Sequence, residues 1–230
     1  MADKKILLGL TTTPNSDWRA KVKEIDTLGL KEIALFPTFL KTTERKELYR
    51  LLEQTALQSI PHVHIRTEDM DLEEIAYLSK KYKAEVFNIH SAQDYPINFD
   101  YSDYKVYWEN TRIIPTEEEL EKYDGLCIDF SHWENYTLLN SAEYLNFEKL
   151  VKKFSCKIGH ISAIKKQSYP NSFRPSAIRY ASSHWMKNLS ELDYIKKYIK
   201  YLPDIISIEL ENSFKEQLKA KAYLEKIINQ

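Results

Sequence analysis

The most constraining feature of this sequence is an alternation of short apolar runs with longer amphipathic stretches, repeated along the chain. Short runs rich in Ile, Leu and Val are typical of buried strands, whereas apolar residues three or four positions apart are typical of helices. Parallel strands need a crossover connection, usually a helix, so the alternation predicts an α/β fold with a parallel sheet. The predicted strands span residues 6–11, 32–36, 61–66, 85–90, 105–110, 126–130, 157–162 and 205–210.

Eight such strand-and-helix units suit a closed (β/α)8 TIM barrel, which typically has about 250 residues. The chain has 230 residues and no Gly/Ser-rich or Pro-rich linker, so we expect a single compact barrel domain over residues 1–230. The alternative is an open doubly wound sheet, which usually carries a glycine-rich phosphate-binding turn after its first strand. Here three threonines and a proline, residues 11–14, follow the first predicted strand.

Capping residues indicate where the helices begin, because Ser, Thr, Asp and Asn side chains accept hydrogen bonds from the free amides of a first turn. Such residues are Ser16 with Asp17, Thr42 with Thr43, Asp71, Thr116, Ser190 and Asn212. Residues 91–104 carry turn residues and no helical period, so we expect the fourth helix to be short or absent. Residues 163–189 are expected to form the longest irregular segment.

Composition excludes several classes of protein. The 33 basic and 34 acidic residues give a net charge of −1, so there is no overall attraction to polyanions. The four glycines lie too far apart for a G-x-G-x-x-G turn or a P-loop, so we expect no nucleotide cofactor. The two cysteines lack C-x-x-C spacing, and no apolar run forms a secretory leader or a membrane span. We therefore expect a cytoplasmic protein without a membrane partner.

Polar residues gather where the predicted strands end, and this is the rim on which barrel enzymes carry their active sites. Buried carboxylates in apolar strands each need a cation, a donor or a metal, because an unpaired charge there costs several kcal/mol. Several carboxylates and imidazoles, with few Lys or Arg between them, favour a divalent metal such as Zn²⁺, Mn²⁺ or Fe²⁺. The residues at this rim are His62, His64, His90, Glu109, Asp129, His132, His160 and Glu209.

These residues, in their order and spacing, resemble the xylose isomerase-like TIM barrels, which include sugar epimerases and isomerases, inosose dehydratase-like enzymes and endonuclease IV. The matching motifs are the pair Glu109-Asn110, the spacing Asp129-x-x-His132, His160, and the run Ser207-Ile208-Glu209. The resemblance covers essentially the whole chain. It implies that Glu109, Asp129, His160 and Glu209 ligate a metal, with His132 beside the substrate or a further metal. Glu211 shares a strand face with Glu209, and the resemblance selects Glu209.

The endonuclease branch adds histidines on the third and fourth strands, which complete a multinuclear zinc cluster. His90 matches the second of these, and either His62 or His64 matches the first. That branch also has an Asp-x-His motif after strand seven, where this chain has Ser182-Ser183-His184. The missing aspartate argues against a complete three-metal cluster.

Basic and aromatic residues near this rim are candidates for substrate binding. Basic residues between positions 164 and 187 suggest an anion-binding lid suited to a phosphate, and tryptophans beside candidate site residues suggest walls that stack on a sugar ring. The expected substrate-binding residues are His62, His184, Lys165, Arg174, Trp133 and Trp185.

The leading hypothesis is a metal-dependent isomerase or epimerase of a small sugar or sugar phosphate. Glu109 and Glu209 would act as the acid/base pair around a metal-stabilised enediolate, with His132 orienting a hydroxyl group. The alternative is a zinc-dependent phosphodiesterase or apurinic-site endonuclease, which would bind nucleic acid. A third reading is a barrel that binds a ligand without turnover. The sequence leaves the oligomeric state open.

Overall fold

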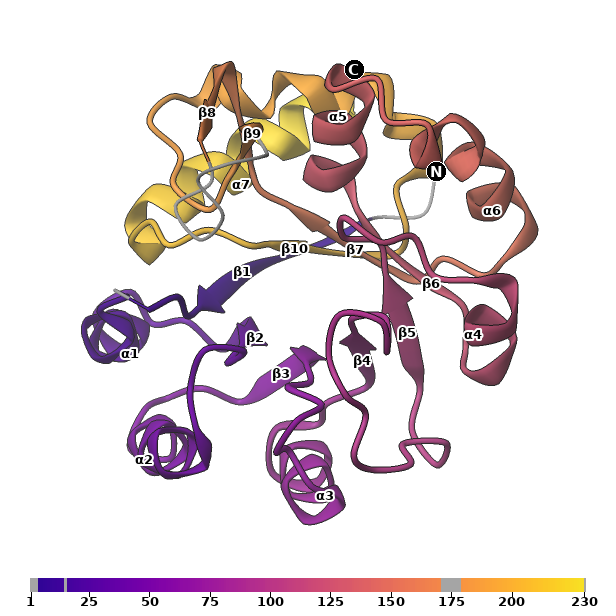
Figure 1. Cartoon of the computed structure of the whole chain (residues 1–230). Helices are drawn as coiled ribbons and strands as arrows, with labels where there is room; N and C mark the ends of the chain where they lie inside the picture. The colour runs from indigo at the N-terminus through magenta and orange to yellow at the C-terminus, as the bar shows by residue number, and fades with distance from the viewer. Residues whose placement is uncertain (1–3, 15, 171–178, 230) are drawn as a thin grey trace.

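The computed structural model describes residues 4–14, 16–170 and 179–229, and its centre is a closed barrel of parallel strands. Around the barrel the strands follow one another in the order β1, β10, β7, β6, β5, β4, β3, β2, and each pairs in parallel with its neighbours. Figure 1 looks into this ring, with the helices on its outside. The bounds are β1 Lys5–Thr11, β2 Glu32–Phe36, β3 Ser59–His64, β4 Val86–Ile89, β5 Val106–Glu109, β6 Leu126–Asp129, β7 Ile158–Ile161 and β10 Ile205–Ile208.

Every predicted barrel strand is confirmed within a few residues at its ends. The helices are α1 Trp18–Thr27, α2 Thr42–Leu52, α3 Leu72–Tyr82, α4 Glu117–Lys122, α5 Phe130–Leu138, α6 Phe147–Lys153 and α7 Phe214–Ile228. Asp17, Asp71 and Thr116 cap α1, α3 and α4 as predicted. The last helix begins one residue later than expected, because Ser213 and not Asn212 caps it.

The crossover from β4 to β5 has no helix in residues 90–105, all of which are described, so the expectation of a missing fourth helix is confirmed. Tyr101 fills the space under this segment: its hydroxyl donates to the backbone oxygen of Met70 at 2.7 Å. The connection after β6, by contrast, contains three helical elements: α5, the short 3₁₀ helix η1 (Glu143–Asn146) and α6.

The segment 163–189 was expected to be irregular, and this expectation is wrong for its described part. Strands β8 (Ala163–Pro170) and β9 (Arg179–Ser183) pair antiparallel there. The hairpin contacts α5 and the 3₁₀ helix η2 (Leu189–Lys197), beside which it lies in Figure 1. The short 3₁₀ helix η3 (Ile199–Tyr201) then leads to β10. The predicted helix near Ser190 is therefore 3₁₀ rather than α-helical in this structure.

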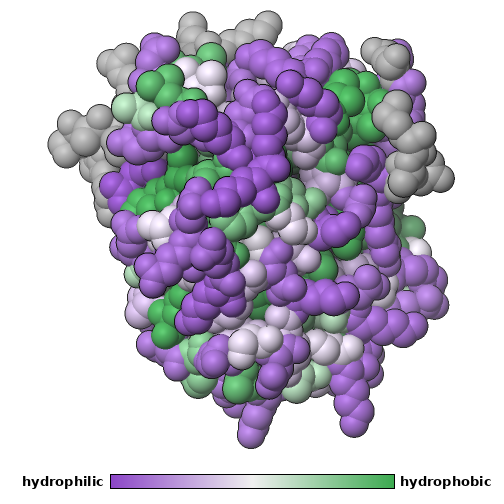
Figure 2. Space-filling model, turned by 90° about the vertical axis from the view of Figure 1, so that its right-hand side faces the viewer, coloured by the Kyte–Doolittle hydropathy of each residue, from purple (hydrophilic) through white to green (hydrophobic). Residues whose placement is uncertain are grey.

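Apolar side chains fill the layer between barrel and helices, while the barrel interior is partly polar. Trp108 packs against Tyr123 in the outer layer, as expected if its neighbour Glu109 points inward. The interior instead holds His62, Asn88 and Ser207, all fully buried. On the face in Figure 2, hydrophilic side chains predominate and hydrophobic ones form separate patches. None of the helices described is both long and apolar enough to span a membrane.

Candidate metal centre

Four side chains from adjacent barrel strands meet at the carboxyl end of the barrel. Glu109 ends β5, Asp129 ends β6, His160 lies in β7, and Glu209 directly follows β10. Parallel pairing in register sets Asp129 beside His160. All four are buried, and one ligand atom from each lies within 4.8 Å of the others. The structure thus brings together the four residues that the resemblance implies as ligands.

Two buried atoms of this group have no hydrogen-bond partner among the described residues: Oδ2 of Asp129 and Nδ1 of His160. The other oxygen of Asp129 caps α5, accepting from the backbone amides of Ser131 at 2.7 Å and His132 at 2.9 Å. This cap uses Oδ1 and leaves Oδ2 without a hydrogen bond. Buried polar atoms almost always have hydrogen-bond partners, so a converging set of oxygen and nitrogen atoms that lack them fits a divalent metal with mixed ligands.

The electrostatics of the group support the same reading. Burial, together with the charges of Glu109 and Asp129, raises the pKa of Glu209 well above its ordinary value. Burial would also raise the pKa of Glu109, but the imidazoles of His160 and His90 hold it well below its ordinary value. The pKa values of these two carboxyls are therefore shifted in opposite directions. A cation among them would favour the charged form of both.

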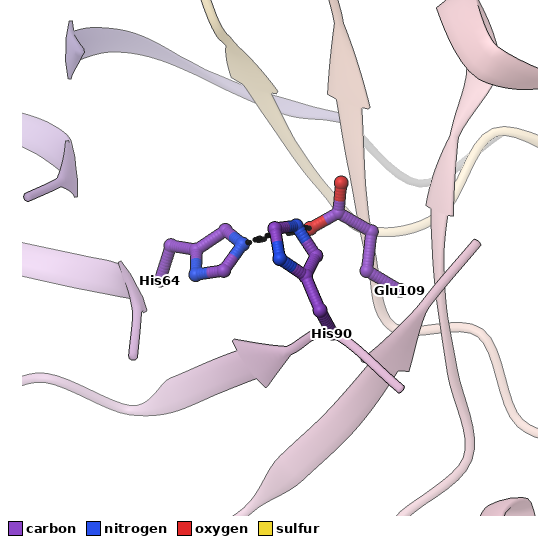
Figure 3. Close-up of side chains that lie close together, drawn as sticks. All are labelled: His64, His90 and Glu109. Carbon is purple, nitrogen blue, oxygen red and sulfur yellow. Dashed lines mark hydrogen bonds and ion pairs between the residues drawn. The ribbon is translucent and has the colours of Figure 1, made fainter. Parts of the chain in front are cut away.

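A second group adjoins the first and shares Glu109 with it. Nε2 of His64 lies 3.0 Å from Oε2 of Glu109, and Nε2 of His90 lies 3.6 Å from the same oxygen. Figure 3 shows the two rings and the carboxylate pointing toward one another. One ligand atom from each of these three residues also lies within 4.8 Å of the others. Oε1 of Glu109 lies 3.4 Å from Nδ1 of His160, so the carboxylate presents one oxygen to each group.

Outer hydrogen bonds orient two of these imidazoles. Nδ1 of His64 lies 3.0 Å from the backbone oxygen of Ile65, which can only accept, so Nδ1 carries the proton and Nε2 offers a lone pair. Nε2 of His160 lies 3.4 Å from Sγ of Cys127, while its Nδ1 faces the carboxylates. Metal-binding histidines usually have such partners on their second nitrogen.

The two groups open into a cavity of about 440 Å³. Its aromatic wall includes Phe39 and Tyr95, and the Tyr95 ring lies 5.2 Å from that of His90. Its polar wall includes Arg112, paired with Asp94 at 3.2 Å, and Thr111. These residues were not predicted from the sequence. Arg112 follows the Glu109-Asn110 motif by two positions, and that proximity is the signal that would have found it.

His132 and His184 line this cavity as well. His132 lies in the first turn of α5, and its Nε2 is 3.6 Å from Oδ2 of Asp129. His184 directly follows β9, and its Nε2 is 4.0 Å from Oε2 of Glu209. Both imidazoles therefore lie at the edge of the four-residue group and on the wall of the same cavity.

His62 does not fit its expected role in substrate binding. The ring is fully buried and lies below the two groups, with Nδ1 2.7 Å from Oγ of Ser207 and Nε2 2.8 Å from Oδ1 of Asn88. His64 is thus the third-strand histidine at the candidate metal site. Glu211 also points elsewhere, with its carboxylate 3.7 Å from Nζ of the buried Lys21.

Three of the predicted substrate-binding residues, Lys165, Trp133 and Trp185, do not line the cavity. Lys165 pairs with Glu191 at 2.7 Å and also donates to the backbone oxygen of Trp185. The Trp185 side chain is 56% exposed. Trp133 packs against Phe147, Tyr198 and Tyr201 in the outer layer. None of these three lines the cavity as described, and Arg174 lies outside the described residues.

No family model matches the sequence, and no curated protein matches it. Among solved structures, a xylose isomerase-like TIM barrel protein from Mycobacterium smegmatis in complex with magnesium has a TM-score of 0.50 at 12% identity, covering 98% of this chain and 96% of that one. A probable 3-DHS dehydratase involved in petrobactin synthesis, from Bacillus anthracis, has a TM-score of 0.49 at 16% identity, covering 99% of both chains. The first likeness shows the fold.

Proposed function

We propose that this chain, which has the fold of the xylose isomerase-like TIM barrels, is a phosphate ester hydrolase that works with two divalent metal ions. The observation that carries the proposal is the sharing of Glu109 between two adjoining ligand groups. Two-metal sites of this kind are typical of phosphatases and nucleases. The resemblance of the motifs to the endonuclease IV branch supports the same reaction class.

In this proposal some residues of the site bind the metal ions and others contact the substrate. His64 and His90 would hold one metal with Oε2 of Glu109; Asp129, His160 and Glu209 would hold the other with Oε1. Bound divalent metals polarise a phosphate ester and lower the pKa of the attacking water. His132 and His184, on the cavity wall, are placed to bind or protonate an oxygen of the substrate. Zn²⁺ or Mn²⁺ suits the mixed imidazole and carboxylate ligands.

A one-metal sugar isomerase or epimerase, the leading hypothesis from the sequence, is the second candidate. It is favoured by the opposite pKa shifts of Glu109 and Glu209, whose carboxylates lie 3.4 and 3.7 Å from Nδ1 of His160. Two carboxyls with opposed shifts are a usual acid/base assignment. The ionised Glu109 would take a proton from carbon and the neutral Glu209 would return one. The phosphoesterase ranks first because this mechanism gives His64 and His90 no role.

The test is an assay of Zn²⁺-loaded and Mn²⁺-loaded protein on bis(p-nitrophenyl) phosphate and on a DNA duplex with one abasic site. We expect hydrolysis that chelation and the variant His90→Asn both abolish. A parallel incubation of aldose and ketose sugars in deuterium oxide tests the second candidate. Exchange of a carbon-bound proton without any phosphodiester hydrolysis would contradict the phosphoesterase proposal.

A further inference from the structure

A continuous set of hydrogen bonds runs through the barrel interior and ends on Glu109. Ser207 in β10, His62 in β3 and Asn88 in β4 supply it, and all three side chains are fully buried. Oγ of Ser207 lies 2.7 Å from Nδ1 of His62, and Nε2 of His62 lies 2.8 Å from Oδ1 of Asn88. Nδ2 of Asn88 then donates to Oε2 of Glu109 at 2.6 Å.

The donor and the acceptor of each hydrogen bond can be assigned by starting from the Asn88–Glu109 end of the chain. The amide nitrogen of Asn88 can only donate, so Oε2 of Glu109 accepts from it. The amide oxygen of Asn88 must then accept from Nε2 of His62, and Nδ1 of His62 accepts from the Ser207 hydroxyl. One arrangement of protons therefore satisfies every group, with His62 neutral and in a single tautomer.

The rings around His62 hold it in place. Phe36 contacts it edge-on at 5.6 Å between ring centroids, and the His160 ring lies at 5.1 Å. Barrel interiors of this type are usually filled by branched apolar side chains, whose burial carries no desolvation cost for polar groups. A buried polar set that is fully paired and leads to a candidate ligand is therefore unusual for the interior.

We infer that His62 and Ser207 are positioning residues which, through Asn88, fix the carboxylate of Glu109 so that it presents one oxygen to each of the two ligand groups. The inference rests on the proposed two-metal function. The last torsion of a glutamate side chain is soft, so an unrestrained carboxylate would rotate. With Oε2 tied to Asn88 and lying 3.0 Å from His64, Oε1 is left toward His160 at 3.4 Å. Each ligand group thereby receives its own oxygen of one residue.

The test uses Asn88→Leu, which removes the donor and keeps the branched shape of the side chain, His62→Phe, which keeps a ring, and Ser207→Ala. Tyr101→Phe is the control, because it removes a buried hydroxyl that donates to the backbone oxygen of Met70 and lies outside the chain of bonds. Each protein is titrated with Mn²⁺ by calorimetry, and electron paramagnetic resonance detects coupling between two bound Mn²⁺ ions. Thermal unfolding of the metal-free proteins records stability separately.

Loss of a partner outside the ligands typically weakens metal binding about 10–100-fold. We expect losses in this range for Asn88→Leu and His62→Phe, a smaller loss for Ser207→Ala, weaker Mn²⁺ coupling in all three, and no change in the control. Parental affinity and coupling in the folded variants, whatever their melting temperatures, would overturn the inference. If Asn88→Leu and His62→Phe prevent folding, the Mn²⁺ affinity and coupling of Ser207→Ala alone decide whether the inference holds. Absence of Mn²⁺ binding by the parent would instead contradict the proposed function.

Discussion

Nε2 of His64 lies 3.1 Å from Nε2 of His90. Two imidazole nitrogens at this separation need either a proton between them or a cation that both bind. Nδ1 of His64 already donates to the backbone oxygen of Ile65, so the neutral ring has only a lone pair to offer at Nε2. Oε2 of Glu109 lies close to both nitrogens. A divalent metal would use all three atoms, and this geometry underlies the two-metal proposal.

The shared position of Glu109 predicts a distinctive pattern of metal loss. Glu109→Gln should weaken both metal sites by about two orders of magnitude, because a neutral amide is a poorer ligand for either group. Asp129→Asn should weaken one site and His90→Gln the other. Asn at position 129 keeps an oxygen that can cap α5, so this variant should remain folded. Metal content after equilibrium dialysis measures the outcome, and equal losses in all three variants would contradict the shared ligand.

The choice of Glu209 over Glu211 makes a second prediction. Glu209 belongs to the four-residue group, whereas Glu211 faces Lys21 in a buried pair. Glu209→Gln should reduce affinity at the four-residue site by about tenfold or more, and Glu211→Gln should leave it within about twofold. Calorimetric titration with Zn²⁺ compares the two variants. The opposite ranking would show that Glu211 is the ligand.

Stability of the metal-free protein should depend on pH through its buried histidines. Burial lowers the pKa of His64 to about 4, against about 6.5 for an exposed imidazole. As the pH falls, the His64 imidazole is therefore protonated in the unfolded chain before it is protonated in the folded one. The contribution of neutral His64 to the free energy of unfolding is fully present above about pH 6.5 and is lost as the pH falls toward 4. We expect this residue alone to lower the free energy of unfolding by about 2 kcal/mol between pH 7 and pH 5.

Urea unfolding in the presence of a chelator measures this dependence. His64→Gln should have a shallower decline over the same interval, since it has no imidazole to protonate at that position. His184 has its pKa lowered to about 4 by burial as well, so part of the decline should remain in the variant. An unchanged slope in His64→Gln would contradict the assignment.

Cys127 should affect metal binding through His160, since its Sγ lies 3.4 Å from Nε2 of that ring. Cys127→Val removes the partner at similar volume, and we expect about tenfold weaker binding at the four-residue site. Cys127→Ser retains an acceptor and should bind metal nearly as the parent does. Zn²⁺ competition with a chromophoric chelator resolves these differences. Parental affinity in Cys127→Val would assign the thiol to packing alone.

The sequence predicted the barrel well because its evidence is local and repeated. Each strand is an apolar run, and most helices begin at a side chain that caps them, as Asp17 and Thr116 do. The hairpin of β8 and β9 escaped prediction because a run such as residues 163–170 lacks clear alternation.

The site was predicted in part for a similar reason. Carboxyl ends of parallel strands meet at one rim, so Glu109 and Asp129 could be grouped from sequence alone. The depth of a residue along the barrel could not be predicted in this way. His62 and His64 share a strand face, yet His62 lies two residues deeper and does not line the cavity. Trp133 was misplaced because α5 begins at Phe130, and successive residues of a helix point in different directions.

The number of metal ions per chain tests the central claim most directly. Parental protein is dialysed against Zn²⁺ or Mn²⁺, freed of loosely bound ions, and measured by elemental analysis against protein concentration. The two ligand groups that share Glu109 predict two ions per chain, falling to one in His90→Gln. One ion per chain in the parent, unchanged in His90→Gln, would contradict the two-metal phosphoesterase and favour the one-metal isomerase.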